Sequence, residues 1–152
     1  MDVESSTNVP IPIVELIKEK FPKLFVTEIR NDNLKFCPEP SLGHVEYKRT
    51  LIRCNKDKEE KYASQMKWRI TENYQKQCAI YYIGVDDDGT IIGLSGDEIF
   101  DCVARFVSIA QSIKASVTGI QIIHINELSI IKIWVKMKKI SNSYLVEFGD
   151  KF

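Results

Sequence analysis

An alternation of apolar and polar residues from position 130 to 138 sets the narrowest limit on the fold. The apolar positions are Ile131, Ile133, Val135 and Met137, and the positions between them are Lys132, Trp134, Lys136 and Lys138. Successive side chains of a strand point to opposite faces, so this pattern predicts a strand with one face in a core and one toward solvent. We therefore expect a sheet of which one face is left partly uncovered.

Other patterns along the chain predict three helices and further strands. The helices are expected over 12–21, 58–76 and 97–115, with Asp57 and Asp97 at the starts of the second and third. The strands are expected over 45–52, 79–85, 90–94, 117–125, 130–140 and 144–148, and 117–125 and 130–140 should form an antiparallel pair. Asp86-Asp87-Asp88-Gly89 predicts a hairpin turn between two of them. This order indicates an α+β fold with a mixed, mostly antiparallel sheet and about three helices.

Length and composition exclude several classes of protein. The 152 residues suit one domain, expected over 11–148 after a flexible leader at 1–10. No apolar run approaches the roughly 20 residues of a membrane helix, and the N-terminus lacks a secretory pattern, so we expect a cytoplasmic protein without membrane contact. Cys37, Cys54, Cys78 and Cys102 are too widely spaced for a zinc motif, and His44 and His124 stand alone. Reduced cysteines, mostly in the core, and no metal site are predicted.

Two groups of basic and aromatic residues are candidates for binding nucleic acid, although 21 basic and 21 acidic residues cancel overall. Lys132, Trp134 and Lys136 would share the solvent face of the last long strand, where lysines neutralise phosphates and a ring stacks on bases. The plainer interpretation is a solvated sheet face whose lysines prevent edge pairing. Lys67, Trp68 and Arg69 form the second group, on a basic helix. There the alternative is that Trp68 seals the helix against the sheet.

Three short strings carry a resemblance to a known family. They are Glu46-Tyr47-Lys48 on the first strand, Gln65-Met66-Lys67-Trp68-Arg69 on the second helix, and Ile83-Gly84-Val85-Asp86-Asp87-Asp88-Gly89 at the hairpin. In this order and spacing the region from 43 to 140 resembles the N-terminal region of the GTP-binding protein 1 and 2 family, which are elongation-factor-like translational GTPases. The resemblance implies an accessory domain that binds RNA or the translation machinery. The contact residues that we expect are Lys48, Arg49, Lys67, Trp68 and Arg69, with Lys132, Trp134 and Lys136 as a second candidate face.

The first and third strings also resemble the Schlafen/AlbA-like domain, whose nuclease members cleave RNA with acidic residues. That resemblance implies an acidic centre at Glu46 and Asp87, with Mg²⁺ or Mn²⁺ as the ion. Those nucleases carry a further Glu five residues before the strand Glu, where this chain has Ser41, and Glu39 lies nearby. The alternatives are turn chemistry for the three aspartates and a charge pair of Glu46 with Lys48.

The end of the chain adds an expectation about nucleotide binding. In the GTPase family a strand leads into the phosphate-binding loop, and here 144–148 would be that strand and 149–152 the truncated start of the loop. The essential Gly, Lys and Ser or Thr would fall at positions 154 to 156. We therefore expect no GTP binding of the family's kind and no cofactor in this chain. The leading hypothesis is a non-catalytic module that binds tRNA or rRNA; the alternatives are a metal-dependent endoribonuclease and a module that docks on a GTPase.

Overall fold

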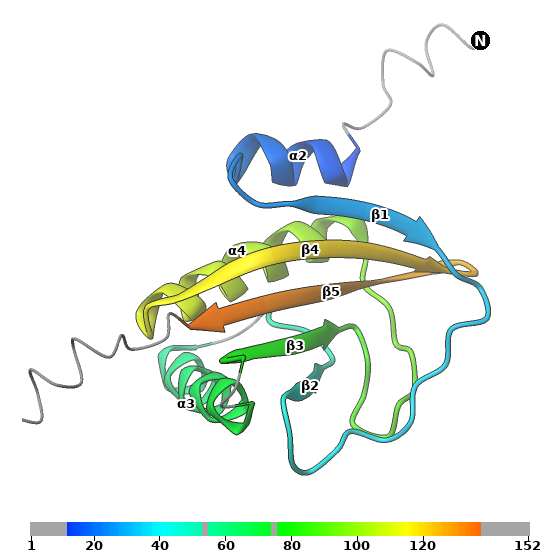
Figure 1. Cartoon of the computed structure of the whole chain (residues 1–152). Coiled ribbons are helices and arrows are strands. Elements are labelled where there is room, and N and C mark those ends of the chain that lie inside the picture. Colours follow the sequence, from blue (N-terminus) through cyan, green and yellow to red (C-terminus); the bar gives the residue numbers. More distant parts are fainter. Residues whose placement is uncertain (1–11, 53–54, 74–75, 138–152) are drawn as a thin grey trace, which may run out of the picture.

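The computed structural model of the chain describes residues 12–52, 55–73 and 76–137 (Figure 1). Within them it has three helices and one five-stranded sheet, which confirms the α+β prediction. In chain order the elements are α2 (Ile13–Lys20), β1 (Val26–Arg30), β2 (Val45–Lys48), α3 (Lys56–Glu72), β3 (Cys78–Ile83), α4 (Gly96–Ser112), β4 (Ala115–Ile125) and β5 (Leu128–Met137). Of these helices, none is both long and apolar enough to cross a membrane.

The sheet is mixed, with the strand order β1-β4-β5-β3-β2. The central pairs β4–β5 and β5–β3 are antiparallel, and the outer pairs β1–β4 and β3–β2 are parallel. The predicted antiparallel pairing of the two long strands is confirmed, with Ile125 opposite Leu128 at the hairpin end. Both edge strands therefore come from the first third of the chain.

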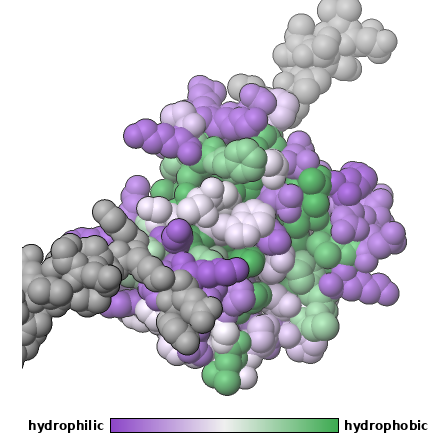
Figure 2. All heavy atoms as spheres, in the orientation of Figure 1, coloured by the Kyte–Doolittle hydropathy of each residue, from purple (hydrophilic) through white to green (hydrophobic). Residues whose placement is uncertain are grey.

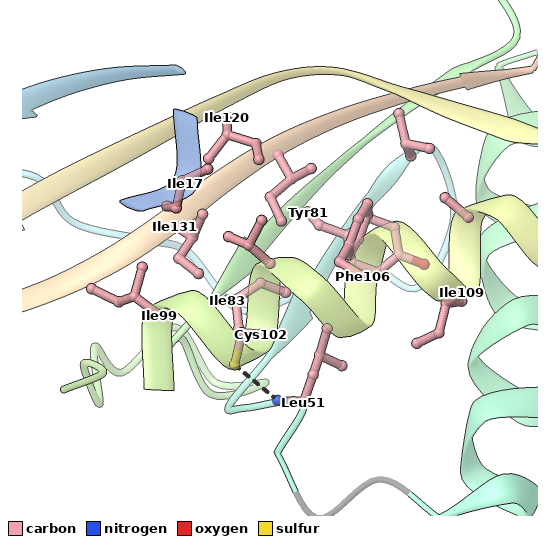
Figure 3. Close-up of a cluster of buried hydrophobic side chains, with 14 of the residues drawn as sticks. Ile17, Leu51, Tyr81, Ile83, Ile99, Cys102, Phe106, Ile109, Ile120 and Ile131 are labelled. Atoms are coloured by element: carbon pink, nitrogen blue, oxygen red, sulfur yellow. Dashed lines mark hydrogen bonds between the residues drawn. The ribbon is translucent and has the colours of Figure 1, made fainter. Parts of the chain in front are cut away.

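The main core lies between α4 and the sheet. In Figure 3, Ile99, Cys102 and Phe106 of α4 face the sheet side chains Tyr81 and Ile131. These α4 residues recur at the three- and four-residue spacing that the sequence shows, because such positions share one helix face. The Sγ atom of buried Cys102 also accepts a hydrogen bond from the backbone N–H of Leu51 at 3.3 Å.

The opposite face of the sheet is covered at one end only. A smaller buried cluster there is formed by Tyr47, Val85, Ile123, Ile125 and Ile130. Leu34 and Phe36, from the segment after β1, pack against it. In Figure 1, α4 lies behind the sheet, and no described helix crosses its front face. The remainder of this face, which carries Lys132, Trp134 and Lys136, is the uncovered part that the alternation predicts.

The helix boundaries differ from the predictions by a few residues. The helix expected over 58–76 spans 56–72, and its N-cap is Asn55 rather than Asp57, because the Asn55 side chain accepts the Lys58 N–H at 2.8 Å. The helix expected from Asp97 begins one residue earlier, capped by Ser95. Ser95 and Glu98 each accept the other's backbone N–H, which is the reciprocal pattern of a capping box.

Two strand predictions need correction, and one strand was not predicted. The strand expected over 45–52 ends at Lys48, and the one expected over 90–94 is only an isolated bridge between Val85 and Ile91. Strand β1 has no sequence prediction, because only Val26 of its five residues is buried and the apolar alternation is missing. The expected strand 144–148, the leader 1–10 and the loop start 149–152 lie outside the described residues. Cys37, Cys78 and Cys102 are free, and Cys54 also lies outside the described residues.

Candidate functional site

A buried ion pair joins β2 to α3. Arg69 of α3 and Glu46 of β2 are 3% and 6% exposed, and Arg69 Nε donates to Glu46 Oε1 at 2.7 Å. On α3, Arg69 shares the face that points to the sheet with the buried residues Met66 and Ile70. A guanidinium taken out of water needs such a partner, since an unpaired buried charge is strongly unfavourable.

The other donors of Arg69 fix the segment that precedes β2. Its two terminal nitrogens donate to the carbonyls of Gly43 and Pro40, each at 3.0 Å. One of them also lies 3.8 Å from Glu39 Oε1. Arg69 therefore fastens the 40–43 segment to α3, and it does not offer a free guanidinium to a phosphate as the sequence led us to expect.

Lys48 completes this arrangement. Its Nζ atom lies 3.2 Å from Glu46 Oε2 and donates to Gln65 Oε1 at 2.8 Å. It also lies 4.3 Å from the ring centroid of Tyr62, in cation–π contact. We call Glu39, Glu46, Lys48 and Arg69 the buried ion network. The first two motif strings thus meet in three dimensions, and the charge pair of Glu46 with Lys48, one of the alternatives, is present.

The carboxylate of Glu39 lies beside that of Glu46. Burial raises the pKa of Glu39, and the neighbouring charges of Glu46 and Asp87 raise it further, whereas the hydrogen bond from the Tyr47 N–H opposes this rise. The backbone N–H of Glu39 donates to the Asp87 carbonyl at 2.7 Å. The sequence could not show whether Glu39 approaches the predicted acidic centre. In the structure it lies between Glu46 and Asp87, the two residues predicted to form that centre.

These carboxylates do not make a metal site in the described residues. No group of three His, Cys, Asp or Glu side chains there is placed to hold an ion. The two oxygens of Glu46 already face Arg69 and Lys48, so cationic side chains hold the ligand atoms that Mg²⁺ would need. A divalent ion does not fit this arrangement.

The three aspartates at the predicted hairpin largely shape a turn. Asp86 Oδ1 accepts the Asp87 N–H, and Asp88 Oδ1 accepts the Thr90 N–H, each at 2.9 Å. The Thr90 side chain, and after it the Thr90 backbone N–H, lowers the pKa of Asp88 by hydrogen bonding to its carboxylate. Gly89 has φ +93, and a Cβ there would lie 2.4 Å from the Phe36 carbonyl oxygen, so only glycine fits.

The remaining residues of the predicted helix surface face solvent. Lys67 is exposed, Trp68 is 42% exposed, and Arg49, with 64% of its side chain exposed, lies 4.0 Å from Asp86. Trp68 lies against the guanidinium of Arg69, whose Cζ is 4.8 Å from its ring centroid. The structure therefore separates this candidate set: Lys48 and Arg69 are internal, whereas Arg49, Lys67 and Trp68 are external.

The second candidate set stays together on the uncovered face of the sheet. Lys132 Nζ lies 4.6 Å from the ring centroid of Trp134 and 5.5 Å from that of Tyr82, its neighbour on β3. Lys136 is exposed on the same face of β5. Figure 2 shows hydrophilic and near-neutral side chains over the middle of this face rather than a continuous hydrophobic surface. We call Tyr82, Lys132, Trp134 and Lys136 the sheet-face cluster.

Two residues of this surface were missed from the sequence. Tyr82 belongs to it because 78–83 alternates as 130–137 does, a signal that could have placed its ring on the outer face of its strand. Its position beside Lys132 comes from the register of β3 with β5. Gly119 lies opposite Trp134 next to a shift in register, and a Cβ there would approach Trp134 Cε3 to 3.3 Å. The absence of a side chain at Gly119 thus leaves room for the indole.

Comparison with known proteins gives two kinds of relative, while no protein-family model matches the chain. The chain is 33% identical over 81 residues to GTP-binding protein 2 of Mus musculus and of Homo sapiens, a match that covers 53% of this chain and 13% of either protein. The resemblance to GTP-binding proteins is therefore confirmed for part of the chain, and the Schlafen/AlbA-like assignment stays a prediction. The chain is also 45% identical over 149 residues to uncharacterized protein R625 of Acanthamoeba polyphaga mimivirus, covering 98% of this chain and 80% of that protein. This chain belongs to the same protein family as R625.

Proposed function

We propose that this chain is a non-catalytic accessory domain of the kind carried by GTP-binding, translation-factor-like proteins, and that it binds RNA through the sheet-face cluster. Its partners would be tRNA or rRNA within the translation machinery, together with a GTPase domain or translation factor. A Schlafen/AlbA-like fold is part of the same proposal.

The observation that carries the proposal is the position of Lys132 beside two aromatic rings. Its ammonium is held near Trp134 and Tyr82 on a face that no described helix covers. Aromatic rings stack on exposed bases, and lysines alongside them neutralise the phosphates between those bases. The cluster therefore fits single-stranded segments or loops of an RNA better than a regular duplex.

Partial similarity to GTP-binding protein 2 supports the second half of the proposal. That protein is named for GTP binding, and the similarity covers only 13% of its length. A segment of this size fits an accessory region beside a GTPase domain.

The test is a titration of labelled tRNA and single-stranded rRNA fragments, followed by fluorescence anisotropy at several salt concentrations. Exchanging Lys132 and Lys136 together for glutamine should weaken binding. The slope of the logarithm of the binding constant against the logarithm of the salt concentration should become shallower by about two. Trp134→Val, which places a β-branched residue suited to a strand at this position, should weaken binding about tenfold through lost stacking.

A matched control removes the same charge elsewhere. Lys18 and Lys20 are exposed on α2, and their double exchange for glutamine should leave the affinity nearly unchanged. Equal losses from both pairs would show that RNA follows net charge and not the sheet-face cluster. Absence of any binding at low salt would reject the proposal outright.

Metal-dependent RNA cleavage by Glu46 and Asp87 is less well supported, because Arg69 and Lys48 already neutralise Glu46. To test for cleavage, the RNA from the same titrations is run on gels after incubation with Mg²⁺, with Mn²⁺ and with chelator. Fragments that require metal and disappear in Asp87→Asn would replace the binding proposal with an enzymatic one.

A further inference from the structure

A groove lies between α2 and the first two turns of α4, away from the sheet-face cluster. Its volume is about 810 Å³, and its apolar lining comes from Pro12, Ile13, Leu16 and Phe100. Ile13 and Phe100 also pack on the main core, so the apolar lining of the groove continues into the interior. A peptide side chain is of the size that such a groove admits.

The rim of this groove is acidic. Asp97 and Asp101 line it, are exposed, and have no ion pair or hydrogen bond among the described residues. Glu98, between them in sequence, is engaged with Ser95 in the capping box. From 77 to 104 the chain has six acidic residues and no basic one. The next basic residue, Arg105, is paired with Glu59, its Nη1 atom 2.9 Å from Glu59 Oε1.

Helix stability accounts for one of these carboxylates but not for the other. Asp97 lies in the first turn of α4, where a negative charge interacts favourably with the helix dipole. Asp101 lies four residues later, beyond that turn, and like charges at this spacing repel each other. Arg105 lies four residues beyond Asp101, at a spacing that would favour a pair, but it pairs with Glu59 at 2.9 Å. A cation placed between the two would relieve this repulsion.

We propose that this groove binds a peptide segment of a protein partner in which a large apolar side chain is flanked by lysine or arginine. The apolar side chain enters between Leu16 and Phe100, and the flanking cations pair with Asp97 and Asp101. The argument for this occupant is charge complementarity, and the same charge excludes RNA from the groove. The inference is independent of the proposed RNA binding, because it uses other elements and the opposite sign of charge.

The test is selection of peptides from a random display library on the full-length protein, followed by anisotropy titrations with synthetic copies of the enriched peptides. We expect enriched peptides to combine an apolar anchor with flanking Lys or Arg. Binding should weaken about fivefold or more when Asp97 and Asp101 are both exchanged for asparagine, because two ion pairs are lost. Leu16→Ala should weaken it through the anchor, and added salt should weaken it in the wild type.

A control variant carries the same charge change outside the groove. Asp57 in the first turn of α3 and Glu127 in the β4–β5 turn are exposed, so Asp57→Asn combined with Glu127→Gln should leave the affinity unchanged. Failure to enrich any peptide, or enriched peptides that bind the Asp97 and Asp101 variant equally well, would overturn the proposal. Sedimentation of the protein alone adds one more outcome: a dimer that Leu16→Ala dissociates would assign the groove to a second copy of the chain and reject the peptide partner. Loss of RNA binding alone would leave this inference untouched.

Discussion

The buried ion network and the sheet-face cluster contain the same kinds of residue in opposite settings. In the network, Arg69 and Lys48 are surrounded by carboxylates, carbonyls and an amide, and little of either side chain reaches solvent. In the cluster, Lys132 lies beside two rings, and Lys136 is exposed. A basic residue is available to bind a ligand only where the fold does not already satisfy its charge.

The largest effect should come from removing the guanidinium of the network. Arg69→Met keeps the aliphatic stem but leaves Glu46 without its closest cation, and it frees the carbonyls of Pro40 and Gly43. We expect the free energy of unfolding in urea to fall by about 3 kcal/mol or more. The exposed Arg49 is the matched control, and Arg49→Met should cost about 0.5 kcal/mol or less. An equal loss of unfolding free energy in the two variants would contradict the distinction between buried and exposed basic residues.

A double-mutant cycle sharpens the same comparison. Glu46→Gln and Arg69→Met should show a coupling energy of about 1–3 kcal/mol, because each removes the partner of the other. Arg69→Met combined with Lys136→Gln, on the opposite face of the sheet, should be additive within about 0.5 kcal/mol. Additivity in the first pair would mean that the contact at 2.7 Å contributes nothing specific.

Removing charge from the sheet-face cluster should lower the RNA affinity but leave the free energy of unfolding nearly unchanged. Exchanging Lys132 and Lys136 for glutamine should change the unfolding free energy by about 0.5 kcal/mol or less, since surface substitutions seldom do more. The RNA affinity should nevertheless fall in these variants. Thermal and urea unfolding measured beside the anisotropy titrations would separate the two effects, and a large loss of stability would show that the lysines belong to the fold.

The smallest expected effect is the pH dependence of the unfolding free energy. It should differ in sign between a carboxylate inside the buried ion network, Glu39, and one outside it, Asp32. The pKa of Glu39 is raised above 4.5 in the folded protein, so its contribution to stability is complete below that value and is lost as the pH rises through the folded-state pKa. The pKa of Asp32 is lowered, chiefly by the Asn126 N–H, so its contribution is present above 3.8 and is lost as the pH falls.

Urea unfolding across this pH range would test both signs. Glu39→Gln should remove a decline of stability above pH 4.5, whereas Asp32→Asn should remove a decline toward acid. A Glu39→Gln variant with the pH profile of the wild type would place that carboxylate outside the network.

Much of the fold follows from periodicity, and the exceptions have physical causes. The spacing of Ile99, Cys102 and Phe106 and the alternation of β5 predict their elements because each buries a continuous face. Strand β1 has no such face, since it pairs with β4 at the edge and buries only Val26. The 90–94 segment is apolar but holds Gly93 at φ +82, and the backbone N–H groups of Ile92 and Gly93 both donate to the Gly84 carbonyl instead of forming a regular ladder.

The candidate site was less predictable because its residues gain their roles from partners far along the chain. The string from Gln65 to Arg69 cannot reveal that Arg69 meets Glu46, 23 residues earlier, while Trp68 remains outside. Tyr82 and Lys132 are likewise joined only by the register of β3 with β5. Face and period could be read from the sequence, but the pairing across the sheet could not.

The strand order has a consequence for how the chain acquires its structure. Both edge strands are made early in synthesis, but β1 must wait for β4, about ninety residues later, before it has a hydrogen-bonding partner. The β4–β5 hairpin, by contrast, closes over a tight local turn at Asn126. Since contacts distant in sequence form slowly, nascent chains on the ribosome would hold β1 unpaired until β4 emerges. Any fragment that ends before β4 loses the centre of the sheet and not merely its margin.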